Sequence, residues 1–299
     1  MHRVALTLAV ATAAVITAVG AGSGAALATT HVAINNNTYY LSLGDSLAQG
    51  VQPNSQGVSV ETNQGYANQL NTALRQTNPY LRLVKMGCPG ETTSTMISGG
   101  ICSYAQGSQL AQAVAFLGKH ASQTQLVTID IGANDLNPCV AFTNPAKIIK
   151  CLDKVIPQTV ANLGQIMTEL RAADPGTIIG MAYYVPELAG WLKGTKAAQE
   201  LAEASVALGK AFNKDLASVY KKFGAPVADV YAAFRTGDFT DMVTTPQFGT
   251  IPLNVALLCS YTWQCAPPPV GPNEHANVLG YGVIAKTFLG TYFNVSKTG

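Results

Sequence analysis

The stretch Gly44-Asp45-Ser46-Leu47 follows directly on the run Tyr39-Tyr40-Leu41-Ser42-Leu43. The residues of this run favour a β-strand, and Gly-Asp-Ser favours a tight turn after it. The short side chain of Ser46 is then expected to stand exposed at the end of a sheet, where it could act as a nucleophile. A second interpretation is a turn in which Ser46 caps a helix that begins at Leu47. The tetrapeptide alone does not decide between the two, so partners must be sought elsewhere in the chain.

The beginning of the chain is typical of a secreted protein. Met1–Arg3 is short and basic, and Val4–Val19 is almost continuously apolar. Ala26–Ala28 supplies a small-x-small cleavage pattern, so residues 1–28 are predicted to be a signal peptide. A membrane anchor is the alternative, but the apolar run is shorter than the roughly 20 residues that span a bilayer. We therefore expect a secreted, extracellular protein without a transmembrane segment.

Composition limits the partners of the mature chain. Removing 28 of 299 residues leaves 299 − 28 = 271, which fits one large domain at 29–299. Without Arg3 the chain has 17 basic and 16 acidic residues, a net charge of +1. Such a balance gives no attraction to nucleic acid or to an anionic surface. Charged residues make up 11% of the chain, and the hydrophobic fraction of 48% argues against disorder.

The six cysteines form an even set in a chain expected to enter an oxidising space. Because they fall as three pairs of sequence neighbours, we expect three disulfides that close short loops, each contributing about 2–3 kcal/mol. The predicted bonds are Cys88–Cys102, Cys139–Cys151 and Cys259–Cys265. A zinc site is the alternative, but the chain has no C-x-x-C pair with a nearby histidine, so no metal is expected.

Strand-like and helix-like patterns alternate along the chain, which predicts an α/β fold with a parallel sheet covered on both faces. Five strands are predicted, at Thr38–Leu43, Leu81–Met86, Leu126–Ile131, Thr177–Tyr184 and Pro226–Val230. Helices are predicted between and after them, at Tyr66–Gln76, Gln109–Leu117, Lys147–Ala173, Thr195–Phe223 and Ala276–Tyr292. Three stretches are expected to be loops or irregular, at Gly50–Glu61, Val185–Lys193 and Phe234–Pro272.

The last of these irregular stretches carries many large apolar residues for a loop. They include Phe248, Ile251, Val255, Leu258 and Trp263. So much apolar surface is expected either to pack on the domain or to line a pocket. We expect core packing for most of the stretch and a substrate wall for the rest.

The loops at the carboxyl ends of parallel strands gather into one crevice. Gly44–Ser46, Gly87–Gly90 and Gly132–Asn134 are those loops for the first three strands. A serine hydroxyl there needs a base, which is most often histidine. Of the mature chain's three histidines, His31 lies near the start and His120 lies before a strand, on the side away from the crevice. Elimination favours His275, which precedes the last helix.

An acyl-transfer site also needs donors directed at the developing oxyanion. The backbone N–H groups of Ser46 and Gly90 and the side-chain amide of Asn134 could supply them. The alternatives are a turn glycine at position 90, an Asx turn or helix cap at position 134, and a capping or surface histidine at position 275.

Taken together, these blocks resemble the SGNH (GDSL) hydrolase family. The matching blocks are Gly44–Leu47, Gly90–Thr92, Gly132–Asp135 and His275–Asn277 with Gly280-Tyr281. The resemblance implies a flavodoxin-like three-layer α/β/α sandwich with a five-stranded parallel sheet. It also implies Ser46 as nucleophile, His275 as base, and Ser46, Gly90 and Asn134 as oxyanion donors. The cysteine pairs are similar to those of secreted actinobacterial lipases and esterases in this family.

The chain departs from the family pattern beside the histidine. An aspartate usually stands two or three residues before the histidine, and here those positions hold Asn273 and Pro272. His275 must be oriented instead by a backbone carbonyl of Gly271 or Pro272, by the Asn273 side chain, or by Glu274. The Glu274 side chain should point away from its neighbour in an extended loop, so we expect a carbonyl and a catalytic dyad.

The sequence therefore predicts a secreted, monomeric serine esterase that needs no cofactor. Its expected substrate is a small or lipid ester, because apolar residues abound between Phe234 and Trp263. A carbohydrate acetylesterase is one alternative, and a binding module with little turnover on the same fold is another.

Overall fold

A computed structural model describes residues 38–140, 144–173 and 176–296 of the chain. Its centre is one all-parallel sheet of five strands in the order β4-β1-β5-β6-β7. The strands are β1 (Thr38–Gly44), β4 (Leu81–Lys85), β5 (Thr124–Asp130), β6 (Ile178–Ala182) and β7 (Val227–Asp229). In chain order the sheet reads 2-1-3-4-5, the flavodoxin-like arrangement. The predicted fold class is confirmed.

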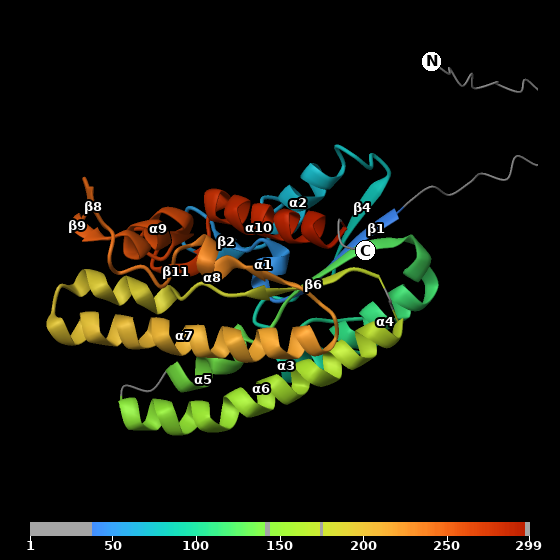
Figure 1. Cartoon of the computed structure of the whole chain (residues 1–299), viewed down its shortest axis with the longest axis horizontal. Helices are drawn as coiled ribbons and strands as arrows, with labels where there is room; N and C mark the ends of the chain where they lie inside the picture. Colours follow the sequence, from blue (N-terminus) through green and yellow to red (C-terminus); the bar gives the residue numbers. More distant parts are fainter. Residues whose placement is uncertain (1–37, 141–143, 174–175, 297–299) are drawn as a thin grey trace, which may run out of the picture. The chain divides into compact units, whose positions relative to one another are not determined.

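Long helices cover both faces of this sheet and make three layers (Figure 1). One face carries α2 (Tyr66–Leu74) and α10 (Val278–Ser296), which pack on each other and on the sheet's edges. The other face carries α4 (Gln109–His120), α6 (Pro145–Ala173) and α7 (Lys196–Lys222). α2, α4, α6 and α7 each have an apolar stripe that needs a partner surface, whereas α10 is apolar over more of its circumference.

The inner strands are buried on both sides. All five residues of β6 and six of the seven residues of β5 are buried. Burial on both sides explains why β6 is apolar or small at every position and why β5 lacks a regular alternation of polar and apolar residues. The signal peptide predicted at residues 1–28 lies outside the described residues.

Shorter elements join these layers. The short helices are α1 (Ser46–Gln49), α3 (Thr93–Ser98), α5 (Asn137–Val140), α8 (Val230–Ala233), α9 (Leu253–Tyr261) and the 3₁₀ turns η1 (Ala121–Gln123), η2 (Ala133–Leu136) and η3 (Pro186–Lys193). The short strands form antiparallel pairs: β2 (Gln52–Pro53) with β3 (Ser59–Val60), β8 (Met242–Thr245) with β9 (Gly249–Pro252), and β10 (Thr262–Trp263) with β11 (Asn273–Ala276).

All three stretches expected to be irregular are wrong in part. Val185–Lys193 contains the 3₁₀ helix η3 (Pro186–Lys193). Gly50–Glu61 contains the β2–β3 pair, whose two-residue strands are too short to leave a pattern. Phe234–Pro272 contains α9 and three short strands, and α9 is apolar on all sides, so it shows no helical period. The expected core packing is confirmed for Ile251, Val255 and Leu258, which are buried.

The six cysteines form three disulfides in the pairing expected from the sequence. Cys88–Cys102 closes the loop after β4, Cys139–Cys151 joins α5 to α6, and Cys259–Cys265 joins α9 to the segment after β10. Two of the three bonds therefore fix segments that follow or border the carboxyl ends of the strands.

Candidate active site

The turn between β1 and α1 presents Ser46 at the carboxyl end of the sheet. Gly44 has φ +132°, and a Cβ atom there would lie 2.1 Å from the carbonyl oxygen of Asp130. Only glycine fits this close approach. The Asp45 carboxylate then accepts a hydrogen bond from the Leu47 N–H at 2.9 Å and caps α1. Asp45, rather than Ser46, is thus the capping residue, and the Ser46 hydroxyl is not used for that role.

A glutamine from α4 holds this turn from the other side. The Gly44 N–H donates to Gln109 Oε1 at 2.7 Å, and Gln109 Nε2 donates to the Gly44 carbonyl at 2.9 Å and to Glu91 Oε2 at 3.0 Å. The Gln109 side chain is fully buried. Sequence reasoning missed it, because a contact between residues 65 positions apart leaves no local pattern.

His275 lies on β11, directly before the last helix, and it is buried. Its Nδ1 is 2.7 Å from Asn273 Oδ1, and its backbone N–H donates to the same oxygen at 3.1 Å. The prediction that a backbone carbonyl of Gly271 or Pro272 orients the ring is therefore wrong. Of the candidate residues Pro272, Asn273 and Glu274, Asn273 holds the ring. The short Asn273 side chain folds back along its own segment and reaches both the ring and the backbone N–H of His275.

The Asn273 amide has only one orientation that satisfies its neighbours. The His275 backbone N–H can only donate, so the oxygen that it meets is Oδ1, and Nδ2 on the other side donates to Ser59 Oγ at 3.0 Å. Because an amide oxygen only accepts, the proton of the neutral ring sits on Nδ1. Nε2 is left with a free lone pair, which is the form a general base requires.

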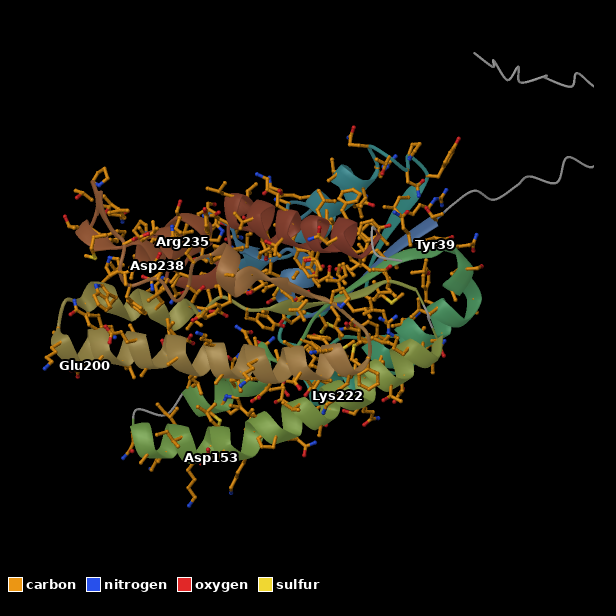
Figure 2. All side chains as sticks on the ribbon, viewed as in Figure 1. Tyr39, Asp153, Glu200, Lys222, Arg235 and Asp238 are labelled. Atoms are coloured by element: carbon orange, nitrogen blue, oxygen red, sulfur yellow. A yellow bond between two sulfur atoms is a disulfide. The ribbon has the colours of Figure 1, made fainter. Side chains whose placement is uncertain are left out.

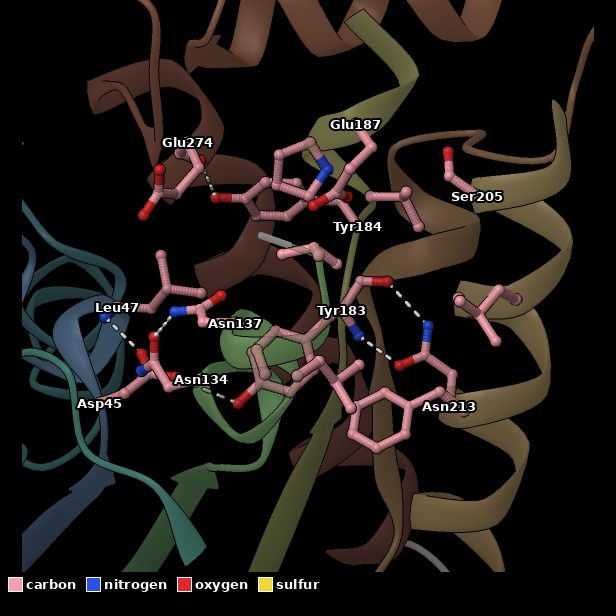
Figure 3. A pocket seen from close by; sticks show the side chains of 18 of the residues that line it. Asp45, Leu47, Asn134, Asn137, Tyr183, Tyr184, Glu187, Ser205, Asn213 and Glu274 are labelled. Carbon is pink, nitrogen blue, oxygen red and sulfur yellow. Dashed lines mark hydrogen bonds between the residues drawn. The ribbon is translucent and has the colours of Figure 1, made fainter. Parts of the chain in front are cut away.

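Burial lowers the pKa of His275 below its ordinary value, and the negative charge of Glu274 opposes this shift. A lowered pKa keeps the imidazole neutral near pH 7. Glu274 also contributes its backbone carbonyl, which accepts a hydrogen bond from the Tyr184 hydroxyl at 2.7 Å (Figure 3). This bond ties the segment that carries His275 to the end of β6.

The loops after β4 and β5 meet beside the serine turn. Asn134, on η2, donates from Nδ2 to the Glu91 carbonyl at 3.0 Å, and its Oδ1 accepts from Asn137 at 3.0 Å (Figure 3). An amide has two N–H donors, so one remains available. Gly90 precedes Glu91 with φ +82° and is exposed. Asn134 thus contacts Glu91, the residue that follows Gly90 in the chain.

Two further polar contacts that the sequence did not reveal hold the walls of the site. Asp135 accepts from the backbone N–H of Thr93 at 2.9 Å and from its hydroxyl at 2.6 Å, which joins η2 to α3. Asn213 of α7 pairs with both the N–H and the carbonyl of Tyr183, each at 2.8 Å (Figure 3). Both contacts link segments far apart in the chain.

Ser46, Asn134 and His275 line one cavity of about 540 Å³. Gly90 is not among the described residues that line it. The apolar wall of the cavity comes from η2, α5, α6 and α7. Its residues are Leu136, Val140, Leu152, Leu208 and Phe212. The carboxyl groups at the cavity belong to Asp45, Glu187 and Glu274, and its described lining includes no Lys or Arg.

The apolar wall is not where the sequence placed it. From Phe234–Pro272 only Gln264 lines the cavity, whereas Ile251 and Val255 are buried in the core. The prediction of a substrate wall in that stretch is wrong for its apolar residues. Those residues pack inward, and the long helices on the other face of the sheet line the cavity instead.

The remaining histidine of the described chain is far from this cavity. His120 packs against Tyr39 with ring centres 4.9 Å apart, at the start of β1, whereas Ser46 follows its end (Figure 2). His31 lies outside the described residues.

Across residues 38–140, 144–173 and 176–296, no group of three or more His, Cys, Asp or Glu side chains is placed to hold a metal ion. In the same part of the chain, no helix combines the length and the apolar character needed to cross a membrane.

Comparisons with known proteins agree with this architecture. The chain resembles the crystal structures of a phospholipase A1 from Streptomyces albidoflavus NA297 (18% identity, 85% of this chain and 99% of that chain, TM-score 0.55) and of an extracellular lipase from Streptomyces rimosus (18% identity, 85% and 99%, TM-score 0.52). It also resembles an acetyl xylan esterase from Geobacillus stearothermophilus (16% identity, 87% and 97%, TM-score 0.50). At these identities the likeness shows the fold.

No curated protein matches the chain by sequence. A family comparison does match: the sequence pattern of the GDSL-like lipase/acylhydrolase family covers residues 42–248, more than half of the chain. The match includes the serine turn and the loops that carry Gly90 and Asn134, and it ends before His275. The chain therefore belongs to the GDSL-like lipase/acylhydrolase family of carboxylic ester hydrolases.

Proposed function

We propose that the protein is a secreted serine esterase in which Ser46 is the nucleophile and His275 the general base. The observation that carries this proposal is that Ser46 and His275, 229 positions apart, line one cavity while Asn273 fixes the ring with Nε2 unprotonated. The signal peptide expected at residues 1–28 and the three disulfides support secretion.

The proposed reaction follows from these positions. His275 Nε2 takes the proton of the Ser46 hydroxyl while Ser46 Oγ bonds to the ester carbonyl carbon. As the bond to the alcohol breaks, His275 passes that proton to the departing alcohol. Water, activated by His275, hydrolyses the resulting acyl-enzyme. The N–H groups of Ser46, Gly90 and Asn134 are proposed to hold the oxyanion in both steps.

We further propose that the acyl part of the substrate is a hydrocarbon chain. The cavity of about 540 Å³ is within the usual range of ligand sites and far exceeds an acetyl group. Its wall of leucines, a valine and a phenylalanine can bury methylene groups at about 0.8 kcal/mol each. Lipid esters therefore suit the cavity better than acetylated sugars.

A fluorophosphonate that reacts with activated serines tests the nucleophile and the base. We expect it to label the intact protein on Ser46 and to leave Ser46→Ala and His275→Ala unlabelled. Absence of labelling in the intact, folded protein would favour the alternative of a binding module without turnover.

A series of p-nitrophenyl esters from acetate to palmitate tests the acyl chain. Leu208→Trp, which fills the cavity, should lower kcat/KM for octanoate by about tenfold and change acetate by less than about threefold. Leu201→Trp is the matched control, since Leu201 lies on the same helix but is 60% exposed. A sharp preference of the intact enzyme for acetate would contradict the lipid proposal and support a carbohydrate acetylesterase.

A further inference from the structure

Two buried carboxyl groups lie against each other beneath the proposed nucleophile. Asp130 ends β5 and Asp45 follows β1, and these strands are neighbours in the sheet. Asp45 is 2% exposed and Asp130 is not exposed at all, and the charge of each carboxyl group acts on the other. The Asp45 N–H donates to the Asp130 carbonyl at 3.1 Å. The backbone bond and the shared burial therefore hold the two carboxyl groups in one enclosed site.

The donors around the pair account for three of its four oxygens. Asp45 Oδ1 accepts from the Leu47 N–H, and Oδ2 lies 3.4 Å from the Tyr183 hydroxyl. Asp130 Oδ1 accepts from the Tyr66 hydroxyl. Asp130 Oδ2 is buried, and no described group donates to it. A buried carboxylate oxygen without a donor is costly, whereas a protonated one becomes a donor itself.

Among the described residues, the titratable groups that interact with the pair are acids and tyrosines and include no cation. They are Tyr40, Tyr66, Tyr183, Tyr184, Tyr220, Tyr281 and Asp135. Glu91 is joined to the same turn through Gln109 and adds another carboxyl group. None of these groups carries positive charge, so a second ionised carboxyl would be repelled as well as desolvated.

We propose that Asp45 and Asp130 hold one proton between them at neutral pH, carried on Asp130 Oδ2 and donated to Asp45, and that this hydrogen bond positions the Ser46 turn. Asp45 stays the acceptor because it caps α1 through the Leu47 N–H. Asp130 is thus a positioning residue: it acts on Ser46 through Asp45. This role in catalysis rests on the proposed function, whereas the shared proton does not.

The shared proton predicts how stability depends on pH. Burial raises the pKa of both carboxyl groups, and the Asp45 charge raises that of Asp130 further. The folded state then keeps a proton that the unfolded chain releases above about pH 3.9. This contribution to stability is fully present below that pH and is lost as the pH rises through the folded-state pKa.

Thermal unfolding at pH 5, 7 and 9 measures this dependence. In Asp130→Asn an amide N–H takes the place of the acid proton. This N–H does not ionise between pH 5 and pH 9. We expect the Tm of this variant, relative to the natural protein, to rise by about 3 °C or more between pH 5 and pH 9. Asp153→Asn, the same substitution at the exposed surface of α6 (Figure 2), should give a constant difference. A constant difference for Asp130→Asn would overturn the proposal.

A second measurement needs no variant at position 130. In carboxyl-carbon NMR of the natural protein labelled at aspartate Cγ, one resonance should remain protonated at pH 7, where an ordinary aspartate is ionised. The same resonance should persist in Asp135→Asn, which removes the half-buried aspartate nearby. A spectrum in which every aspartate is ionised at pH 7 would overturn the shared proton even if Asp130→Asn failed to fold.

Ester hydrolysis separates the positioning role from a purely structural one. Asp130→Ala should lower kcat by about tenfold or more with little change in KM, because a displaced nucleophile reacts slowly with substrate that still binds. Asp130→Asn should restore most of kcat at pH 7. Equal kcat values in the two folded variants would overturn the positioning role. An inactive natural protein with the predicted Tm pattern would instead locate the failure in the proposed function.

Discussion

The side chain of Asn273 supplies part of what a carboxylate supplies in a Ser-His-Asp triad. Its Oδ1 accepts from His275 Nδ1, and Ser59 fixes the amide from the other side. The arrangement sets the tautomer of the ring, but it adds no full negative charge to stabilise the imidazolium of the proposed reaction. The acceptor and its orientation are therefore the features to test first.

Removing the acceptor at position 273 should slow the reaction. In Asn273→Leu the ring is free to adopt the tautomer with the proton on Nε2, so kcat should fall by about 10–100-fold. Steady-state kinetics on a p-nitrophenyl ester measures this. A variant that is folded and as active as the natural protein would show that Asn273 does not set the tautomer.

The pH profile of kcat/KM reports the base itself. Because burial lowers the pKa of His275, the neutral ring persists below its ordinary pKa, and the acidic limb should have its midpoint below about 6.5. Asn273→Asp keeps the acceptor and adds a charge that favours the imidazolium. We expect that variant to move the limb to higher pH, and an unmoved limb would contradict the contact.

The neighbouring carboxylate should matter little for the rate. Glu274 bonds to Tyr184 through its backbone carbonyl, so Glu274→Gln keeps that contact. We expect its kcat to stay within about tenfold of the natural value, measured at the optimum pH of each protein. A loss near 10³–10⁴ would show that an acid is required after all.

At the scale of elements, the β1–α1 turn is the tightest part of the site. A Cβ atom on Gly44 would clash with the backbone carbonyl of Asp130 in β5. Gly44 also has a φ of +132°, which other residues rarely adopt. Gly44→Ala should therefore lower the free energy of unfolding by about 3 kcal/mol or more. Gly118→Ala, on the exposed face of α4 with no atom within 4 Å, should stabilise the protein by about 0.5–1 kcal/mol. Urea unfolding compares them, and equal effects would contradict the close approach at Gly44.

Elements could be predicted from the sequence where the spacing of their apolar residues fits only a strand or only a helix. The apolar residues of β5 and β6 and the apolar stripe of α7 are visible in the sequence because these elements pack on the core. The helix α9 was missed, since burial on several sides removes the period. Ser46, Gly90 and Asn134 could be located because strand ends share one edge. Gln109, Asp130 and the amide orientation of Asn273 could not, because they act through contacts distant in the chain or between side chains.

For the molecule as a whole, the disulfides connect stability to the shape of the cavity. Cys139–Cys151 joins α5 to α6, and Val140 and Leu152, next to these cysteines, line the cavity. Replacing both cysteines by serine should lower the free energy of unfolding by about 2–3 kcal/mol. The Cys259–Cys265 disulfide closes a shorter loop. Replacing both of its cysteines by serine should therefore lower the free energy of unfolding by a smaller amount. A larger loss at the shorter loop would contradict this order.

The charge of the cavity lining bears on what happens after hydrolysis. An ester is neutral, whereas the acid it yields is an anion at neutral pH. The described lining holds Glu187 and Glu274 and no Lys or Arg that could retain a carboxylate. If the substrate is the proposed lipid ester, we expect these walls to repel the carboxylate of the product. Inhibition by fatty acid should then be weak, and departure of the acid should not limit turnover.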